Sequence, residues 1–104
     1  MDIIVFDAKH AEEFGLHEAI LIAHFITEIR YKKKTNENVK NGRVWVRSSL
    51  NTLAKKIPCF SPKQLERIIN SLINQNVIIK EFFNEHNFDR TCWYSFRDDK
   101  KFLR

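Results

Sequence analysis

Glycine, proline and cysteine are scarce in this sequence, and each scarcity excludes a class of protein. Two glycines and two prolines in 104 residues leave little room for long flexible linkers. The two cysteines, Cys59 and Cys92, are too few and too far apart for a disulfide scaffold or a Cys-x-x-Cys metal site, so we expect packing thiols. No apolar run approaches the length of a membrane span, and the N-terminus lacks a basic signal region. We therefore expect a cytoplasmic protein without a membrane partner.

Motifs for catalysis and metal binding are also missing. The sequence has no glycine-rich phosphate loop, no paired-carboxylate motif and no cluster of His, Cys and Asp at metal-ligand spacing. His10, His17 and His24 recur every seven residues, which places successive helical positions two turns apart, too far to hold one ion. These absences predict a protein that is not an enzyme and that uses no cofactor and no metal.

Acidic residues are unevenly distributed along the chain. Residues 1–31 carry two Lys or Arg and six Asp or Glu, whereas residues 32–104 carry sixteen and seven. The window 32–63 holds nine cations and one acid, Glu37. Such a polarised chain can steer a polyanion to one side of the protein. The alternative is that these cations only form a lysine-rich solvated surface. The uneven distribution of charge makes nucleic-acid binding at least as good an explanation of the basic segment.

The N-terminal third predicts a lead-in and a long core helix within one domain spanning residues 1–104. Residues 1–15 form the lead-in, in which an apolar run, either a short strand or an extended segment, precedes a helix that Asp7 caps and Gly15 ends. The longest helical pattern runs from Leu16 to about Tyr31. Its apolar side chains cover more than half the circumference, which is typical of a core helix or, alternatively, of a partner interface.

The middle of the chain predicts a basic loop, a strand and a short helix. Residues 32–42 are polar and rich in turn signals, which indicates a mobile basic loop. Residues 43–47 alternate like a short strand. Ser48 or Ser49 then caps a helix that keeps its apolar period until Pro58 stops it.

The clearest helix signal begins at Ser61. Ser61 can cap the helix, Pro62 suits its first position, and Gln64 stands where a capping box needs Glu or Gln. The apolar residues share one face: Leu65, Ile68, Ile69, Leu72 and Ile73. Only a few residues separate this helix from the preceding one, which favours a helix-turn-helix arrangement.

The C-terminal third changes to an extended period. Residues 77–83 and 91–97 are β-prone, and residues 84–90 supply turn chemistry, so we expect a β-hairpin. Residues 98–104 are expected to be a flexible tail. The order of core helix, strand, helix-turn-helix and hairpin predicts an α+β fold, mainly α. Its expected form is a winged helix-turn-helix, with three to four helices and a C-terminal β-hairpin wing.

Several sequence blocks resemble the winged-helix DNA-binding domains of phage and mobile-element replication proteins, the replisome-organiser type. Gly15-Leu16-His17-Glu18-Ala19 resembles their Gly-Leu-x-Glu-Ala opening. Similar blocks follow in the same order at 43–46, 57–61, 65–68 and 88–94, so the resemblance runs over residues 14–96. It implies a DNA-binding domain of this kind.

Two departures refine the resemblance. Those proteins often carry glycine after the recognition helix, where Gln75-Asn76 stands here, although asparagine can adopt the left-handed cap. Phage replisome organisers usually continue into a second domain that recruits a helicase or its loader, and no residue follows Arg104 here. The sequence is therefore more similar to stand-alone accessory proteins encoded beside primase-polymerases on bacterial mobile elements.

The resemblance implies a non-catalytic DNA-binding accessory protein in the replication of a phage or mobile genetic element. We expect it to bind single-stranded DNA, or duplex with low sequence specificity, and to partner a primase, polymerase or helicase. A lone domain has a small footprint, whereas strong sequence specificity usually needs two half-sites, which favours the single strand. One alternative is a transcriptional regulator that binds a specific duplex as a homodimer, and another is a protein-interaction module without a DNA target.

The expected DNA contacts fall into three groups. Base-reading candidates lie on the outer face of the Ser61 helix: Lys63, Gln64, Arg67, Asn70, Ser71 and Asn74. Backbone-binding candidates are Lys32, Lys33, Lys34, Arg43, Arg47, Lys55, Lys56, Lys80 and Arg90. Candidates for stacking on single-stranded bases, with core packing as the alternative for each, are Trp45, Phe60, Phe82 and Phe88.

Overall fold

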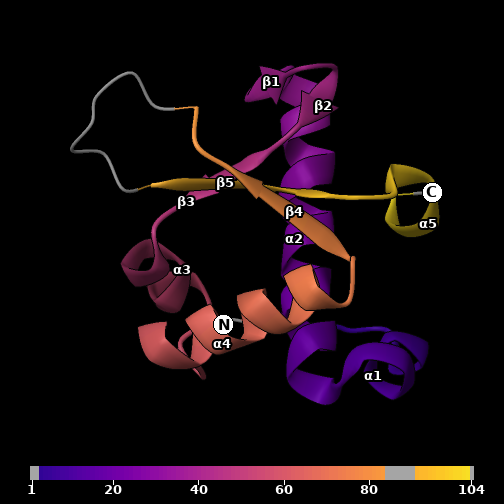
Figure 1. The fold of residues 1–104 in the computed structure, drawn as a ribbon, viewed down its shortest axis with the longest axis vertical. Coiled ribbons are helices and arrows are strands. Elements are labelled where there is room, and N and C mark those ends of the chain that lie inside the picture. The colour runs from indigo at the N-terminus through magenta and orange to yellow at the C-terminus, as the bar shows by residue number, and fades with distance from the viewer. Residues whose placement is uncertain (1–2, 84–90, 104) are drawn as a thin grey trace.

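The computed structural model describes residues 3–83 and 91–103 (Figure 1). This part of the chain is α+β, with two small antiparallel sheets, which confirms the predicted class. The helices are α1 (Ala8–Phe14), α2 (Leu16–Thr35), α3 (Leu50–Lys56), α4 (Pro62–Asn74) and α5 (Asp99–Phe102). The strands are β1 (Val39–Lys40), β2 (Arg43–Val44), β3 (Val46–Ser48), β4 (Ile78–Glu81) and β5 (Cys92–Phe96). No described helix is both long enough and apolar enough to cross a lipid bilayer.

Helix α2 passes through the middle of the molecule and supplies much of the core, as its sequence predicted (Figure 1). Its inward-facing side chains are at most 1% exposed: Ala19, Leu21, Ile22, Phe25 and Ile29. Full burial of a large apolar side chain stabilises a fold by about 1.5–3 kcal/mol. Most of the apolar surface that had suggested a partner interface is therefore used inside the domain, while Leu16 at the start of the helix is exposed.

Helix α2 is longer than the sequence predicted, because it continues to Thr35. Asn36 then adopts the left-handed conformation, and the N–H groups of Asn36 and Glu37 bond to the carbonyls of Lys33 and Lys32. This pair of bonds forms a Schellman cap. The three lysines at 32–34 thus lie on the last helical turn, where cations interact favourably with the helix dipole.

The remainder of the predicted loop is a small hairpin of β1 and β2. Its register leaves Asn41 and Gly42 as a two-residue turn, and both have positive φ, which is typical of a type I′ turn. Trp45 follows β2, is buried, and donates from its indole Nε1 to the carbonyl of Lys40 at 2.9 Å. The prediction of a mobile basic loop is therefore wrong, since residues 32–44 are helix end, cap and hairpin.

The junction of α1 and α2 depends on Gly15. Helix α1 begins as predicted, with the Asp7 carboxylate accepting from the Lys9 N–H at 2.8 Å. Gly15 follows with φ 117° and ψ 153°, a region that is essentially restricted to glycine. A Cβ at this position would also meet the Glu18 side chain. Before α1, residues 3–7 form neither helix nor strand, and their side chains are exposed.

Helices α3 and α4 follow each other closely, as predicted. The Ser49 hydroxyl accepts from the Thr52 N–H at the start of α3. At the start of α4, the Ser61 hydroxyl accepts from the Gln64 N–H and the Gln64 Oε1 accepts from the Ser61 N–H, which is the predicted capping box. Asn76 ends α4 in the left-handed conformation (φ 60°), as expected for an asparagine at this position.

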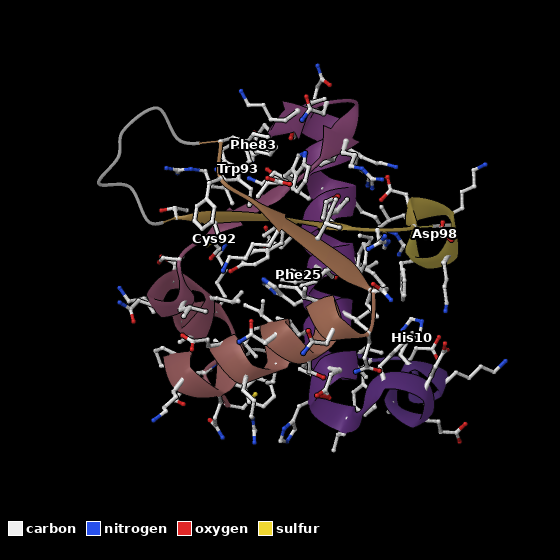
Figure 2. All side chains as sticks on the ribbon, viewed as in Figure 1. His10, Phe25, Phe83, Cys92, Trp93 and Asp98 are labelled. Atoms are coloured by element: carbon white, nitrogen blue, oxygen red, sulfur yellow. The ribbon has the colours of Figure 1, made fainter. Side chains whose placement is uncertain are left out.

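The larger sheet has the strand order β3-β5-β4 and carries a buried aromatic side chain of β5 on each face. Strands β4 and β5 pair antiparallel, which confirms the predicted hairpin strands, while its turn at 84–90 lies outside the described residues. Tyr94 lies on the helix side, with its ring stacked 5.6 Å from that of Phe25. Trp93 lies on the opposite side, 5.5 Å from the ring of Phe83 (Figure 2).

The C-terminal segment is not a flexible tail, contrary to the prediction. Helix α5 places Phe102 against the sheet, where its ring is 6% exposed and stacks on Phe96 at 4.7 Å. The Lys101 ammonium also lies 3.0 Å from the Glu13 carboxylate of α1. One buried aromatic ring thus fixes a segment whose other side chains are mostly charged.

The structure also bears on the predicted packing of the two cysteines and on the stacking candidates. Cys59 is exposed, so its predicted packing role is wrong, while Cys92 is half-buried. Trp45 and Phe60 are 2% and 7% exposed, so core packing applies to them and base stacking does not. Phe88 lies outside the described residues.

His24 makes the stability of the domain depend on pH. Burial lowers its pKa below 6.5; the Glu28 carboxylate opposes this shift, and the Lys56 ammonium adds to it. The unfolded chain therefore binds the proton more readily, and stability should fall as pH decreases from about 6.5 through the folded-state pKa. We expect urea unfolding to show a smaller loss of stability between about pH 7.5 and pH 5 for His24→Gln than for the wild type. Equal losses would contradict this role of His24.

Candidate nucleic-acid interface

The exposed face of α4 forms a shallow open groove of about 840 Å³. Capping at Ser61 and burial of the apolar face together determine which side chains point outward. Six predicted base-reading residues line this groove: Lys63, Gln64, Arg67, Asn70, Ser71 and Asn74. The structure thus brings together the whole predicted α4 group on one surface, joined there by Glu66.

Two members of this group already have structural partners. Gln64 uses its Oε1 in the capping box. The Ser71 hydroxyl accepts from the Gln75 amide at 3.1 Å, and the same amide donates to the Phe14 carbonyl of α1 at 3.0 Å. Lys63, Arg67, Asn70 and Asn74 are exposed and carry the cationic and amide character of the groove.

A second pocket of about 460 Å³ lies between α3, α4 and the sheet. Asn51 belongs to α3, Glu66 and Asn70 belong to α4, and Lys80 and Tyr94 belong to β4 and β5. Glu66 and Asn70 also line the α4 groove, so the two hollows share a wall. We call this second hollow the interhelix–sheet pocket.

Tyr94 forms part of the pocket wall as a neutral phenol. Burial raises the pKa of Tyr94 well above its usual range, and the neighbouring Cys92 and Glu66 raise it further. Its hydroxyl therefore keeps its proton throughout the physiological range and can donate a hydrogen bond.

Lys80 and Phe82 extend this surface beyond the pocket. Alternate residues of a strand share a face, which places Lys80 on the side of Ile78 and Tyr94, and Phe82 directly follows the strand. The Lys80 ammonium lies 5.5 Å from the Phe82 ring centroid, and Phe82 is 60% exposed. Among the stacking candidates that the structure describes, Phe82 alone presents its ring to solvent.

Other predicted backbone-binding residues lie beside α2 or on the opposite face of the sheet. Lys55 and Lys56 occupy the last turn of α3, and the Lys56 ammonium is 3.7 Å from the Glu28 carboxylate. Arg47 is on the opposite face, with its guanidinium 5.9 Å from the Trp93 ring centroid. Arg90 lies outside the described residues.

The lysines of α2 and Arg43 belong to a different region. The last turn of α2 and the β1–β2 hairpin lie at one end of the molecule and α4 at the other (Figure 1). Lys32 pairs with Glu37 at 3.1 Å. Arg43 donates from Nη1 to the Phe96 carbonyl at 2.6 Å and from Nη2 to the Arg97 carbonyl. The predicted cations therefore do not form one continuous surface.

Sequence reasoning missed the interhelix–sheet pocket. The helical period placed Glu66 at the flank of the outer face of α4, but Asn51, Tyr94 and Cys92 join it only through tertiary packing. In the described segments, no group of three or more His, Cys, Asp or Glu side chains is placed to hold a metal ion. Comparison of the chain with protein-family models, curated proteins and solved structures gives no match.

Proposed function

We propose that this protein is a winged helix-turn-helix DNA-binding accessory protein. In this assignment α3 and α4 form the helix-turn-helix, and β4 and β5 form the wing with β3 beside them. The close succession of two capped helices and then a hairpin supports this fold, as does the resemblance in the sequence. The assignment makes α4 the helix that faces DNA.

One observation carries the DNA-binding proposal. Lys63, Arg67 and two exposed asparagines line the α4 groove, which adjoins the pocket bordered by Lys80. Cations bind the phosphate backbone and amides bind base edges, so this groove combines both kinds of contact. Glu66 is the exception on this surface, and its carboxylate disfavours close approach of a phosphate there.

Single-stranded DNA is the favoured target. Phe82 presents an exposed ring beside the Lys80 ammonium, and base stacking on an aromatic residue beside a cation is typical of single-strand binding. The protein then acts without catalysis in the replication of a phage or mobile element. The primase, polymerase or helicase partner rests on the resemblance, and the exposed apolar side chains of Ile3 and Val5 support a protein partner of some kind.

Fluorescence anisotropy over a salt series tests this function. We expect single-stranded DNA of scrambled sequence to bind more tightly than the matching duplex, with the logarithm of affinity falling linearly with the logarithm of salt concentration. Tight binding only to one palindromic duplex would replace this proposal with a dimeric transcriptional regulator. Absence of binding to either DNA at low salt would replace it with a protein-interaction module.

Phe82→Ala tests the stacking contact. Loss of one stacked base costs about 1–3 kcal/mol, so single-strand affinity should fall about tenfold while duplex affinity changes less than threefold. Phe82→Trp keeps an aromatic face and should retain the affinity. Equal losses for Phe82→Ala and Phe82→Trp would show that a stacked ring is not what Phe82 supplies.

A further inference from the structure

The interhelix–sheet pocket has the size and construction of a small-ligand site. Its volume of about 460 Å³ lies within the range of about 300–1,000 Å³ that is usual for such sites. Leu50, Ile69 and the Tyr94 ring give it apolar walls, and Lys80 stands on its border. Figure 2 shows Cys92 at the start of β5, on the side toward α3, whereas Trp93 and Phe83 lie on the other side.

Polar side chains in this pocket have unused hydrogen-bonding capacity. The side chains of Asn51, Glu66 and Asn70 are exposed, and within residues 3–83 and 91–103 none of them makes a hydrogen bond or ion pair to the protein. The Glu66 carboxylate only accepts hydrogen bonds, and the Asn70 amide both donates and accepts them. The carboxylate and the amide are suited to hydrogen bonds with the edge of a flat heteroaromatic ring, and the apolar walls are suited to contact with its face.

We propose that this pocket binds one unpaired DNA base that carries an exocyclic amino group, an inference that rests on the proposed single-strand function. The Glu66 carboxylate accepts a hydrogen bond from the amino group, and the Asn70 amide donates to an adjacent ring nitrogen or carbonyl. Cytosine, adenine and guanine offer both groups. In the orientation that cytosine takes, thymine places its O4 carbonyl against the carboxylate, which repels it, and places a ring N–H donor against the Asn70 amide.

The surroundings of the pocket accommodate the rest of the strand. The Lys80 ammonium at the border can bind the phosphate of the inserted nucleotide. Phe82 follows β4, lies with its ring 5.5 Å from the Lys80 ammonium and can stack the neighbouring base. A base paired in a duplex cannot enter, because its edge is already occupied. The pocket therefore also explains a preference for single strands.

Oligonucleotides of about 12 cytidines or 12 thymidines test the pocket, because cytosine has an amino group and a ring-nitrogen acceptor where thymine has a carbonyl and a ring N–H. The wild type should bind the oligo-dC about tenfold more tightly than the oligo-dT in fluorescence anisotropy. Glu66→Gln should reduce this ratio to within about twofold, since a glutamine amide can donate to thymine as well as accept from cytosine. We compare the ratio of the oligo-dC and oligo-dT affinities because the loss of a negative charge in Glu66→Gln raises the affinity for both oligonucleotides alike.

Glu81→Gln is the matched control, since it removes the same charge from the exposed opposite face of β4. It should leave the oligo-dC to oligo-dT ratio unchanged. Equal binding of both oligonucleotides by the wild type, or an unchanged ratio in Glu66→Gln, overturns the base pocket while the DNA-binding function stands. Failure of the wild type to bind any DNA overturns the proposed function and the pocket with it.

Discussion

The double variant Lys63→Glu, Arg67→Glu is expected to lose affinity for single-stranded DNA on the order of 30-fold at low salt. Both side chains project from the exposed face of α4 into its groove. The reversal of charge at these two residues replaces two favourable contacts with DNA phosphates by two repulsive ones. The salt dependence should weaken as well, by about 1.4 in the slope of the log–log plot, because two fewer phosphates are neutralised. Anisotropy titrations at several salt concentrations measure both quantities.

The matched control is Lys33→Glu, Lys34→Glu, which changes the net charge equally. These lysines are exposed on the last turn of α2, at the other end of the molecule from α4 (Figure 1). At 0.1 M salt we expect the control to retain affinity within about threefold, because the Debye length is then about 10 Å and more distant exposed charges are largely screened. Equal losses in the two variants would show that net charge alone, and not the α4 groove, governs binding.

Phe102→Ala is expected to lower the free energy of unfolding by about 3 kcal/mol. The Phe102 ring stacks on Phe96 at 4.7 Å and lies 6.0 Å from the ring of Phe14, so truncation leaves a cavity between α5, α1 and the sheet. The total free energy of unfolding of a domain of this size is about 5–15 kcal/mol, so the expected loss is a large fraction of the total. Urea unfolding followed by circular dichroism measures the change.

Phe82→Ala is the stability control for this experiment, since its ring is 60% exposed. It should change the free energy of unfolding by less than about 0.5 kcal/mol. A change as small as this in Phe102→Ala would mean that α5 contributes nothing to stability and that the C-terminal segment behaves as the flexible tail that the sequence predicted.

Local signals in the sequence were sufficient to predict where most of the helices begin. Asp7 and Ser61 cap the helices they were expected to cap, Ser49 is the one of two candidate serines that caps α3, and the apolar period identified the buried face of α4. The end of α2 was misplaced, because lysine is a good helix former but also common in loops. Only the left-handed Asn36, five residues beyond the predicted end at Tyr31, shows where the helix stops.

Contacts between distant segments could not be predicted from local patterns. Helix α5 contains one apolar residue, Phe102, and its partners Phe96 and Phe14 belong to other elements. The same limit applies to the site. The outer face of α4 followed from the helical period, whereas the pocket requires the strand register that brings Lys80 opposite Tyr94.

The contact between the first and last helices affects how the domain opens. The Lys101 ammonium and the Phe102 ring of α5 lie against Glu13 and His10 of α1, with 3.0 Å between charged atoms and 5.4 Å between rings. Neither terminal helix can detach without exposing the apolar surface of the other. Fraying, which normally begins independently at each end of a chain, is coupled here. The backbone amides of α1 and α5 should therefore exchange with solvent deuterium as one cooperative unit.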